Sequence, residues 1–360
     1  MLYYILVPTI LLLPVLTDKI KNGKRFYFFV VTSLLILFAG FRHWSVGIDT
    51  PSYVNFFLNG KGITEYTFSS IFKETEFLHI IYRSIIRSLT DNYFWYLFPV
   101  ACFYTIVVAR FIYKHSAYPS ISFLAFLSMS YYAFSMTGIR QTICYGFLII
   151  AADALLSGKR LRAIFYIVVS AGFHATGWLF LSAVLIDLIP FGFAFLGGVF
   201  VLSAISYLKA PVFIQLFVRM LDKSEDYLEF ETGSTVILLV IVTVSLAALL
   251  LHPDIFKKTS PERNMNGTLV KSTTQKDQFY IKMILFAIPI LIITLYQASI
   301  FRVAAMFHFY MLALIPGVIK KQSDPYIQVL GKMIIIVTLL AELFIFTYGA
   351  AGVLPYSFSI

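Results

Sequence analysis

Long runs without a charged side chain constrain this chain more than any other feature. Residues 235–251 are uncharged and almost all apolar, with no alternation of polar and apolar positions. Strands of membrane barrels alternate in short segments, whereas a helix satisfies its own backbone hydrogen bonds inside hydrocarbon. The sequence therefore predicts helices that span a membrane.

The composition extends this prediction to the whole chain. Of the 360 residues, 59% are hydrophobic and 13% are charged, which is too little polar surface to cover a water-soluble globule of this size. We find no internal repeat, low-complexity tract or separable soluble domain. We therefore predict an all-α polytopic membrane protein, with residues 1–360 forming a single transmembrane domain of about 11–12 transmembrane helices.

The distribution of charge predicts the orientation. The chain has 28 Lys and Arg against 18 Asp and Glu, and most of the basic residues fall in short loops, which indicates loop bias rather than a nucleic-acid partner. Basic loops at 18–25 and 252–282 are assigned to the cytoplasm, so the N-terminus lies outside. The apolar run at 2–16 has no basic region before it and no small-residue cleavage site, and we interpret it as a first span rather than a removed signal peptide.

Two segments on the outer side carry polar residues. Residues 42–91 are expected to form an extracytoplasmic loop with an amphipathic helix over 75–89 that lies on the outer surface and has one apolar stripe. An acidic loop is expected over 209–232. Because the chain lies on the cytoplasmic side before residue 163 and on the outer side after residue 208, it must cross the membrane an odd number of times between 163 and 208.

This parity predicts a broken helix. Residues 163–188 can supply two short helices in a hairpin, and the only plausible apex is 171–174. Broken helices are tolerated at membrane depth where they are buried in protein or line a wet cavity. We expect His174 to point into such a cavity.

Three arginines stand at the ends of apolar runs and fall on the same outer side as His174: Arg42, Arg140 and Arg302. Guanidinium groups bind phosphate oxygens in pairs and stay charged at any working pH. Such a cluster suits a diphosphate, and neutralising a leaving diphosphate would ease the breaking of a sugar C1–O bond.

Other side chains near these arginines could complete an active site. A general base could be His174 or a carboxylate such as Asp49 or Glu76. Aromatic rings that could stack on sugars include Trp44, Tyr53 and Tyr132. The two cysteines lie inside apolar runs without metal-ligand spacing, so we expect no metal and no cofactor.

The short motifs, taken in order, resemble the EpsG-type exopolysaccharide polymerases, relatives of the Wzy O-antigen and capsule polymerases. Two positions depart from the pattern, because a serine is expected after the histidine and a second small residue at position 48. The motifs are Arg42, Gly47-Ile48-Asp49-Thr50, Tyr53, Glu76-Phe77, Gly138-Ile139-Arg140-Gln141, Phe173-His174-Ala175-Thr176 and Arg302.

This resemblance implies a membrane glycosyltransferase with a GT-C-like architecture, active at the outer face of the bacterial inner membrane. It would join oligosaccharide repeat units carried on undecaprenyl diphosphate, with a flippase and a chain-length regulator as partners. Arg140 and Arg302 would bind the diphosphates, and Arg42 and Asp49 would shape the site. His174 or Glu76 would be the base.

Simpler explanations remain open for each group. Arginines at helix ends also anchor in lipid headgroups, Arg42 and Asp49 could pair with each other, and His174 could bind a backbone carbonyl inside the core. A flippase or transporter of lipid-linked oligosaccharide, or a polysaccharide ligase, are the alternative functions. A flippase needs basic groups reachable from both sides, whereas a polymerase needs them outside.

Overall fold

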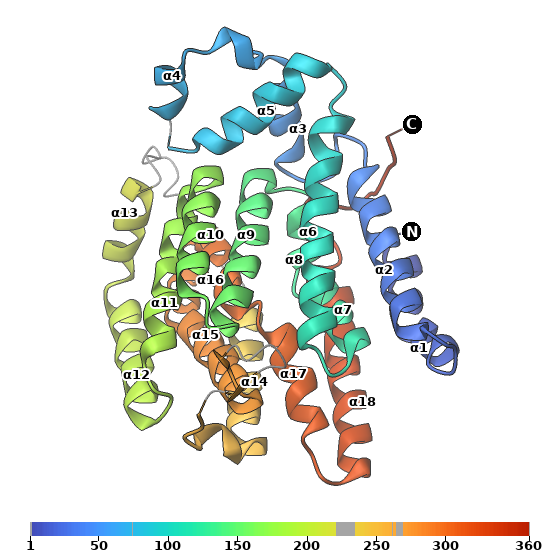
Figure 1. Ribbon diagram of the computed structural model, residues 1–360, viewed down its shortest axis with the longest axis vertical. Coiled ribbons are helices and arrows are strands. Elements are labelled where there is room, and N and C mark those ends of the chain that lie inside the picture. The colour runs from blue at the N-terminus through green and yellow to red at the C-terminus, as the bar shows by residue number, and fades with distance from the viewer. Residues whose placement is uncertain (1, 74, 221–234, 261, 264–268, 360) are drawn as a thin grey trace.

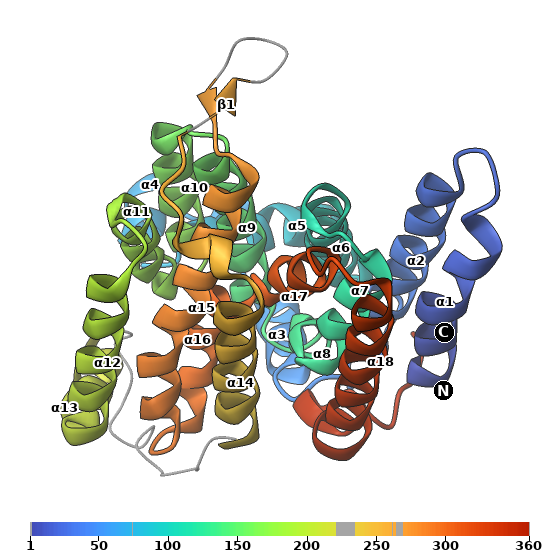
Figure 2. The ribbon, with the colours of Figure 1, turned by 90° about the horizontal axis from the view of Figure 1, so that it is seen from below.

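The computed structural model describes residues 2–73, 75–220, 235–260, 262–263 and 269–359. Nearly all the regular structure in these ranges is helical, and the predicted all-α class is confirmed (Figures 1 and 2). Among the described residues, five helices are long and apolar enough to cross a membrane, and up to seven spans result if each of two bent helix pairs counts as one, compared with the 11–12 expected. The chain is therefore a polytopic membrane protein.

The five long apolar helices are α2 (Gly23–Gly40), α6 (Phe94–His115), α9 (Ile139–Leu156), α15 (Thr273–Thr294) and α18 (Pro325–Ala341), which runs on into a π-helical turn (Glu342–Thr347). The bent pairs are α12 (Phe193–Leu208) with α13 (Ala210–Met220), at 86°, and α16 (Phe301–His308) with α17 (Met311–Lys320), at 47°. Shorter apolar helices are α1 (Leu2–Thr17), α7 (Pro119–Ser128), α14 (Thr235–Leu251) and the segment Ala175–Leu188.

The remaining helices are short. They are α3 (Thr50–Leu58), α4 (Phe68–Phe72), α5 (Phe77–Leu89), α8 (Tyr131–Ser135), α10 (Arg160–Phe173) and α11 (Leu181–Leu188). Turns of 3₁₀ helix are η1 (Ile63–Glu65), η2 (Ala175–Phe180), η4 (Pro253–Phe256), η5 (Ala298–Ile300) and η7 (Ala350–Gly352). Two antiparallel two-residue strands, β1 (Glu262–Arg263) and β2 (Leu269–Val270), form a small ribbon.

Helices α9 and α15 form the centre of the bundle. Of each helix's most apolar window, 72% is buried, whereas only 17% of α18 is buried. Helix α9 packs between α6 and α10, and α15 packs against α12, α14 and α16. The outer helices therefore present their apolar side chains to the surrounding lipid, as expected where lipid replaces water as solvent.

The predicted hairpin near residue 174 is confirmed. Helix α10 ends at Phe173, His174 is extended with φ −154° and ψ 127°, and η2 and α11 return beside α10. The break places the His174 side chain where two short helices meet rather than on the lateral surface of one helix.

Several predicted boundaries were wrong. Residues 210–220 form helix α13 instead of the beginning of an acidic loop, and the five acidic residues expected there lie outside the described residues. Helix α15 begins at Thr273 rather than at 283, because Ser272 and Gln275 form a reciprocal capping box that starts the helix within the basic loop. Residues 119–136, which we expected to form one span, break at Ser130, whose φ is +60°, between α7 and α8.

Helix α5 occupies the segment predicted as an amphipathic helix, and the structure shows which way its two stripes face. Its buried side chains are His79, Arg83 and Ser84, whereas Leu89 is 80% exposed. The polar stripe packs onto the protein and the apolar stripe faces outward. This orientation suits a helix at a lipid boundary, where polar groups must find partners inside the protein.

The C-terminal segment returns to the C-terminal end of α2. The N–H of Ser359 donates to the carbonyl of Phe41 at 2.8 Å, and the N–H of His43 donates to that of Ser357 at 2.9 Å. Just beyond, the N–H groups of Gly47 and Ile48 donate to the carbonyls of residues 352 and 351, each at 2.9 Å. Residues 41–48 are thus held by backbone bonds to residues 351–359.

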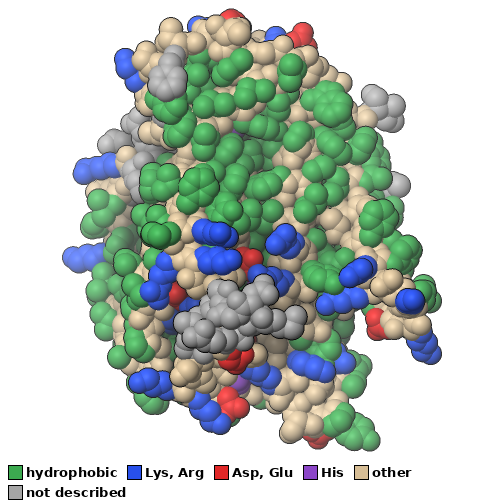
Figure 3. Space-filling view, viewed as in Figure 1, with side chains coloured by type: hydrophobic (Ala, Val, Ile, Leu, Met, Phe, Trp, Pro, Cys, Tyr) green, Lys and Arg blue, Asp and Glu red, His purple; other side chains and the backbone are tan. Residues whose placement is uncertain are grey.

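The two ends of the bundle differ in composition. Helices α3, α4 and α5 form a cap over the upper ends of α9 and α10 (Figure 1). In the same view, most of the visible Lys and Arg side chains lie over the lower half of the molecule, and hydrophobic side chains cover most of the upper half (Figure 3). The capped end therefore lies opposite the basic end.

Candidate active site

Arg140 and Glu76 form an ion pair beneath the cap. Arg140 stands in the first turn of α9, where the helix dipole disfavours a cation, so a nearby anion is needed. Its Nη1 donates to Oε2 of Glu76, which directly precedes α5. The two side chains are 36% and 16% exposed, so the pair is partly shielded from solvent and still accessible.

The second oxygen of Glu76 faces the break in the hairpin. The backbone N–H of Ala175 donates to Oε1 at 3.4 Å. Nε2 of His174 lies 3.9 Å from the same oxygen, which is longer than a hydrogen bond. The carboxylate therefore lies between an arginine on one side and a histidine on the other.

Thr176 fixes the orientation of the His174 ring. Nδ1 accepts the backbone N–H of Thr176 at 3.3 Å and lies 2.8 Å from its hydroxyl. Because Nδ1 is an acceptor, the proton of a neutral ring is on Nε2, the nitrogen that faces Glu76.

A glycine allows α5 to approach α10 closely. A Cβ on Gly172 would lie 2.7 Å from Cδ1 and 2.8 Å from Cγ of Leu78, closer than real contacts. Leu78 is two residues from Glu76 and Gly172 two residues from His174. The close packing therefore brings the carboxylate and the imidazole together.

Tyr53 and His79 line the other side of Arg140. The hydroxyl of Tyr53 accepts a hydrogen bond from Nε of Arg140 at 3.3 Å. The guanidinium carbon lies 5.5 Å from the centre of the Tyr53 ring. His79 is buried, and its Nε2 lies 2.9 Å from the hydroxyl of Tyr96. Burial, and then the Arg140 and Arg83 cations, keep the pKa of His79 well below its usual range, so this ring is neutral.

A second ion pair joins Asp49 and Arg302. Their atoms Oδ2 and Nη2 are 3.4 Å apart, and the side chains are 32% and 37% exposed. The N–H of Asp49 donates to Oγ1 of Thr137 at 2.7 Å. The turn before Asp49 requires glycine, because Gly47 has φ +99° and a Cβ there would lie 2.4 Å from the carbonyl oxygen of Met136.

Residues 134–140 anchor both ion pairs. Phe134 lies under Arg302, with 5.5 Å between the guanidinium carbon and the ring centre. Tyr145 of α9 donates its hydroxyl to the carbonyl of Arg302. Arg140 ends this segment, and Tyr53 contacts it from α3, four residues after Asp49. The two pairs therefore share one support.

Other predicted residues lie apart from these pairs. Arg42 is 1% exposed; its Nη1 donates to the carbonyl of Ala39, and burial lowers its pKa to about 10. Tyr132 is fully buried and its hydroxyl donates to the carbonyl of Leu35 at 2.7 Å. Neither contacts Glu76, Arg140 or His174 among the described residues. Trp44, at 43% exposed, is the open aromatic ring of the turn after α2.

Sequence reasoning missed the groups that orient the site. Thr176, which fixes the imidazole, stands in the recognised histidine motif but was given no role, and Thr137, which holds Asp49, directly precedes the recognised arginine motif. His79 and Tyr96 gave no signal beyond a polar residue on an amphipathic helix and one aromatic residue among many. Their role depends on the inward orientation of α5, which periodicity does not determine.

Comparison with known proteins identifies relatives. The chain matches the amylovoran biosynthesis protein AmsC of Erwinia amylovora with 27% identity over 180 residues, which is 49% of this chain and 46% of that protein. The alignment thus spans about half the length of the relative. No solved structure matches the chain.

The family match covers far more of the sequence. The EpsG family pattern matches residues 25–358, which include both ion pairs, the broken hairpin and the segment that returns to α2. The chain belongs to the EpsG family.

Proposed function

We propose that this protein is a membrane glycosyltransferase that polymerises undecaprenyl-diphosphate-linked oligosaccharide repeat units into an exopolysaccharide. The observation that carries the proposal is the arrangement of Arg140, Glu76 and His174 beside the pair Asp49–Arg302 at one end of the bundle. Family membership and the resemblance to a protein of amylovoran biosynthesis support it.

The two arginines suit the binding of diphosphate. Arg140 and Arg302 each contact one carboxylate and remain about one-third exposed. A guanidinium carries five N–H donors in a fixed plane, so each arginine keeps donors for phosphate oxygens after binding its carboxylate. Positive charge held at the leaving diphosphate would stabilise the negative charge that develops as the sugar C1–O bond breaks.

The gap between Glu76 and His174 suits an acceptor hydroxyl. An oxygen about 2.8 Å from both Oε1 and Nε2 fits across their separation of 3.9 Å. Its proton would be donated to Glu76, and Nε2–H would donate to the oxygen and stabilise the charge left on it. Of the two predicted bases, this geometry favours Glu76, with His174 as the hydrogen-bond donor.

The remaining residues would shape the pocket. Tyr53 and Trp44 present rings that could stack on sugars, whereas Tyr132 and Arg42, which are buried, would support the site. Asp49 would hold Arg302 in position rather than act as a base. The reaction would use no metal.

Loop charge supports an outward-facing site in a bacterial inner membrane. The basic loops lie at the end of the bundle opposite the cap, and short basic loops stay in the cytoplasm. The cap would then lie on the outer side, where lipid-linked units arrive after transport. A flippase and a chain-length regulator would be the functional partners.

The test is complementation of a deletion strain with wild type, Arg140→Ala or Arg140→Lys, after equal membrane levels have been checked. Arg87→Lys is the matched control, because Arg87 of α5 also pairs with a carboxylate, that of Asp91, but lies outside the cluster. Undecaprenyl-linked saccharides and surface polymer are extracted and sized.

Loss of long polymer, with single repeat units on the outer leaflet, is the expected result for both Arg140 variants. Accumulation of single units on the inner leaflet would identify a flippase instead. Long polymer that stays on its lipid carrier would identify a ligase. Unchanged polymer in the alanine variant would exclude Arg140 from the active site.

A further inference from the structure

A cavity lies at the basic end of the bundle, away from the candidate active site. It has a volume of about 650 Å³. The end of α9, the start of α10, the end of α11, residues 256–259 and the first half of α15 line it. Such a volume falls in the range of small-molecule sites. One acidic side chain, Asp187, lines it together with five basic ones: Arg160, Lys257, Lys258, Lys271 and Lys282.

The single carboxylate does not balance these cations. The side chain of Asp187 is 2% exposed and forms an ion pair with Lys271. Its Oδ2 also lies 4.0 Å from Nη2 of Arg160. Lys257 pairs with Asp254, which does not line the cavity, at 2.6 Å. The cavity therefore has an excess of positive charge for a ligand to neutralise.

Lys282 fixes the floor of the cavity. It is 5% exposed, and its Nζ donates to the carbonyls of Ile186 and Ile189, each at 2.8 Å, and of Asp187 at 3.3 Å. These carbonyls belong to the last turn of α11 and to the residue that follows it, where a cation is stabilising. Lys282 thus holds the structure, and the more exposed cations face the cavity with only Asp187 among its lining residues to balance their charge.

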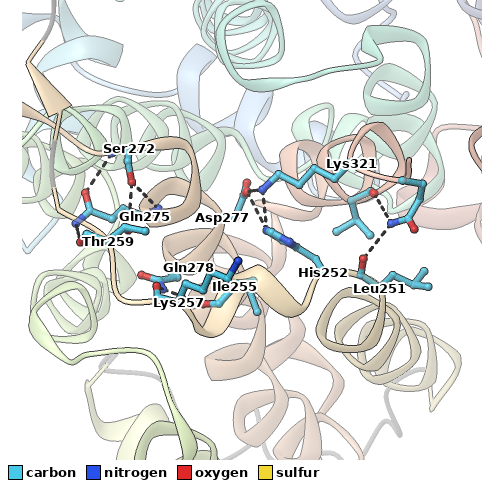
Figure 4. A network of polar contacts seen from close by, with 12 residues as sticks. Leu251, His252, Ile255, Lys257, Thr259, Ser272, Gln275, Asp277, Gln278 and Lys321 are labelled. Atoms are coloured by element: carbon cyan, nitrogen blue, oxygen red, sulfur yellow. Dashed lines mark hydrogen bonds and ion pairs between the residues drawn. The ribbon is translucent and has the colours of Figure 1, made fainter. Parts of the chain in front are cut away.

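The wall that carries Lys257 and Lys258 is held in place by α15 (Figure 4). Nε2 of Gln275 donates to the carbonyl of Thr259 at 2.9 Å. Nε2 of Gln278 donates to the carbonyls of Ile255 and Lys257, at 2.8 and 3.0 Å. These bonds position the backbone beneath both lysines.

Further along α15, an ionic group holds the start of the same loop. Asp277 lies between Lys321 of the turn after α17 and His252, with 3.4 Å from its Oδ2 to Nε2 of the imidazole. Figure 4 shows these three side chains pointing toward one another. Both ends of the segment 252–259 are therefore attached to the same helix.

The rim of the cavity is apolar. The rings of Phe191 and Phe256 are 5.3 Å apart, and Phe193 stacks on Phe256 at 5.9 Å. Leu188 and Ile189, at the end of α11, are 53% and 46% exposed. A ligand with a charged group and an apolar part would find partners for both.

We propose that this basic-end cavity binds a phosphate-bearing ligand, either the headgroup of an anionic lipid or a soluble diphosphate. Loop bias explains why basic residues occur at this end, but it does not gather five of them around one cavity with a fixed floor and wall. Phosphate oxygens accept charge-assisted hydrogen bonds from Arg160, Lys258 and Lys271. Basic pockets between transmembrane helices are known to bind anionic headgroups.

The test uses the purified full-length chain in zwitterionic nanodiscs. Binding of inorganic pyrophosphate is measured by calorimetry, and retention of phosphatidylglycerol against phosphatidylcholine by native mass spectrometry. The variant Arg160→Gln/Lys258→Gln removes two accessible charges, and Lys320→Gln/Lys332→Gln removes two charges from the same end outside the cavity.

Wild type should bind one of the two probes at least tenfold more tightly than the cavity variant, and added salt should weaken that binding. The control variant should stay within twofold of wild type. Preference for phosphatidylglycerol identifies a lipid headgroup as the ligand, and binding of pyrophosphate identifies a soluble diphosphate. If the cavity variant and wild type bind both probes equally, the proposal is wrong, whatever polymer the cells make.

Discussion

Replacement of Glu76 by glutamine removes a charge from the candidate site with almost no change in size. The amide keeps one oxygen, which can accept from Arg140 or from the N–H of Ala175 but not from both, because these two donors bind different oxygens of the carboxylate. The packing should persist because the size and shape of the side chain are kept. Loss of a fully buried ion pair costs about 3–5 kcal/mol, but Arg140 is 36% exposed, and we expect a loss of about 1–2 kcal/mol in stability.

The loss of activity should be much larger than this loss of stability. Removal of a general base typically lowers a rate by about 10²–10⁴, which is about 2.7–5.4 kcal/mol in the barrier. The assay is the initial rate at which membranes from a deletion strain consume lipid-linked repeat units, normalised to the amount of folded protein. Glu76→Asp should retain more activity than Glu76→Gln, because it keeps the charge.

Glu65→Gln is the matched control. Glu65 lies in the same cap, between α3 and α4, where its carboxylate accepts the N–H of Gly62 at 2.7 Å. Among the described residues it contacts neither Arg140 nor His174. Its rate should stay within threefold of wild type. A Glu76→Gln rate within threefold of wild type, at equal protein level, would refute the assignment of Glu76 as the base.

Three further predictions concern the support of the site. Thr176→Val removes the hydroxyl beside Nδ1 of His174 and keeps the backbone N–H. It should therefore lower the polymerisation rate several-fold and leave the thermal midpoint in detergent within a few degrees of that of wild type. An unchanged rate would show that the hydroxyl is dispensable. Gly47→Ala should cost about 1–3 kcal/mol in stability because of its φ of +99° and the contact with Met136, measured as a lower thermal midpoint, whereas Gly192→Ala, with open space around it, should not. Because the pKa of His79 is lowered in the folded chain, the unfolded chain binds more protons at this residue as the pH falls below about 6.5. The free energy of unfolding should therefore be highest, as far as His79 is concerned, above about pH 6.5 and should decrease below it. His79→Gln should flatten that part of a plot of thermal midpoint against pH.

The sequence predicted the fold class and the position of the site for physical reasons that act locally. Apolar runs of sufficient length must be helical in lipid, and the break at His174 follows from counting crossings between basic loops. Arg140 was recognised because an arginine at the start of an apolar helix needs an explanation. Its partner Glu76 was proposed as a base, but nothing in the sequence indicated that the two would pair.

Features that depend on tertiary packing could not be predicted. The inward orientation of the α5 polar stripe depends on which surface lipid covers, and periodicity alone fits either orientation. The burial of Arg42 and Tyr132 depends on the C-terminal segment and on neighbouring helices. The early start of α15 was predictable in principle, since Ser272 and Gln275 have the spacing of a capping box.

The backbone bonds between residues 41–48 and 351–359 have a consequence for how the protein matures during synthesis. Helices such as α9 and α10 can pair as soon as they enter the membrane, because they are neighbours in the sequence. The turn that carries Asp49 receives part of its backbone support only after nearly the whole chain has been inserted. A nascent chain stalled before α18 would therefore hold Arg140, Glu76 and His174 but lack the fixed position of Asp49, so the site would be completed last.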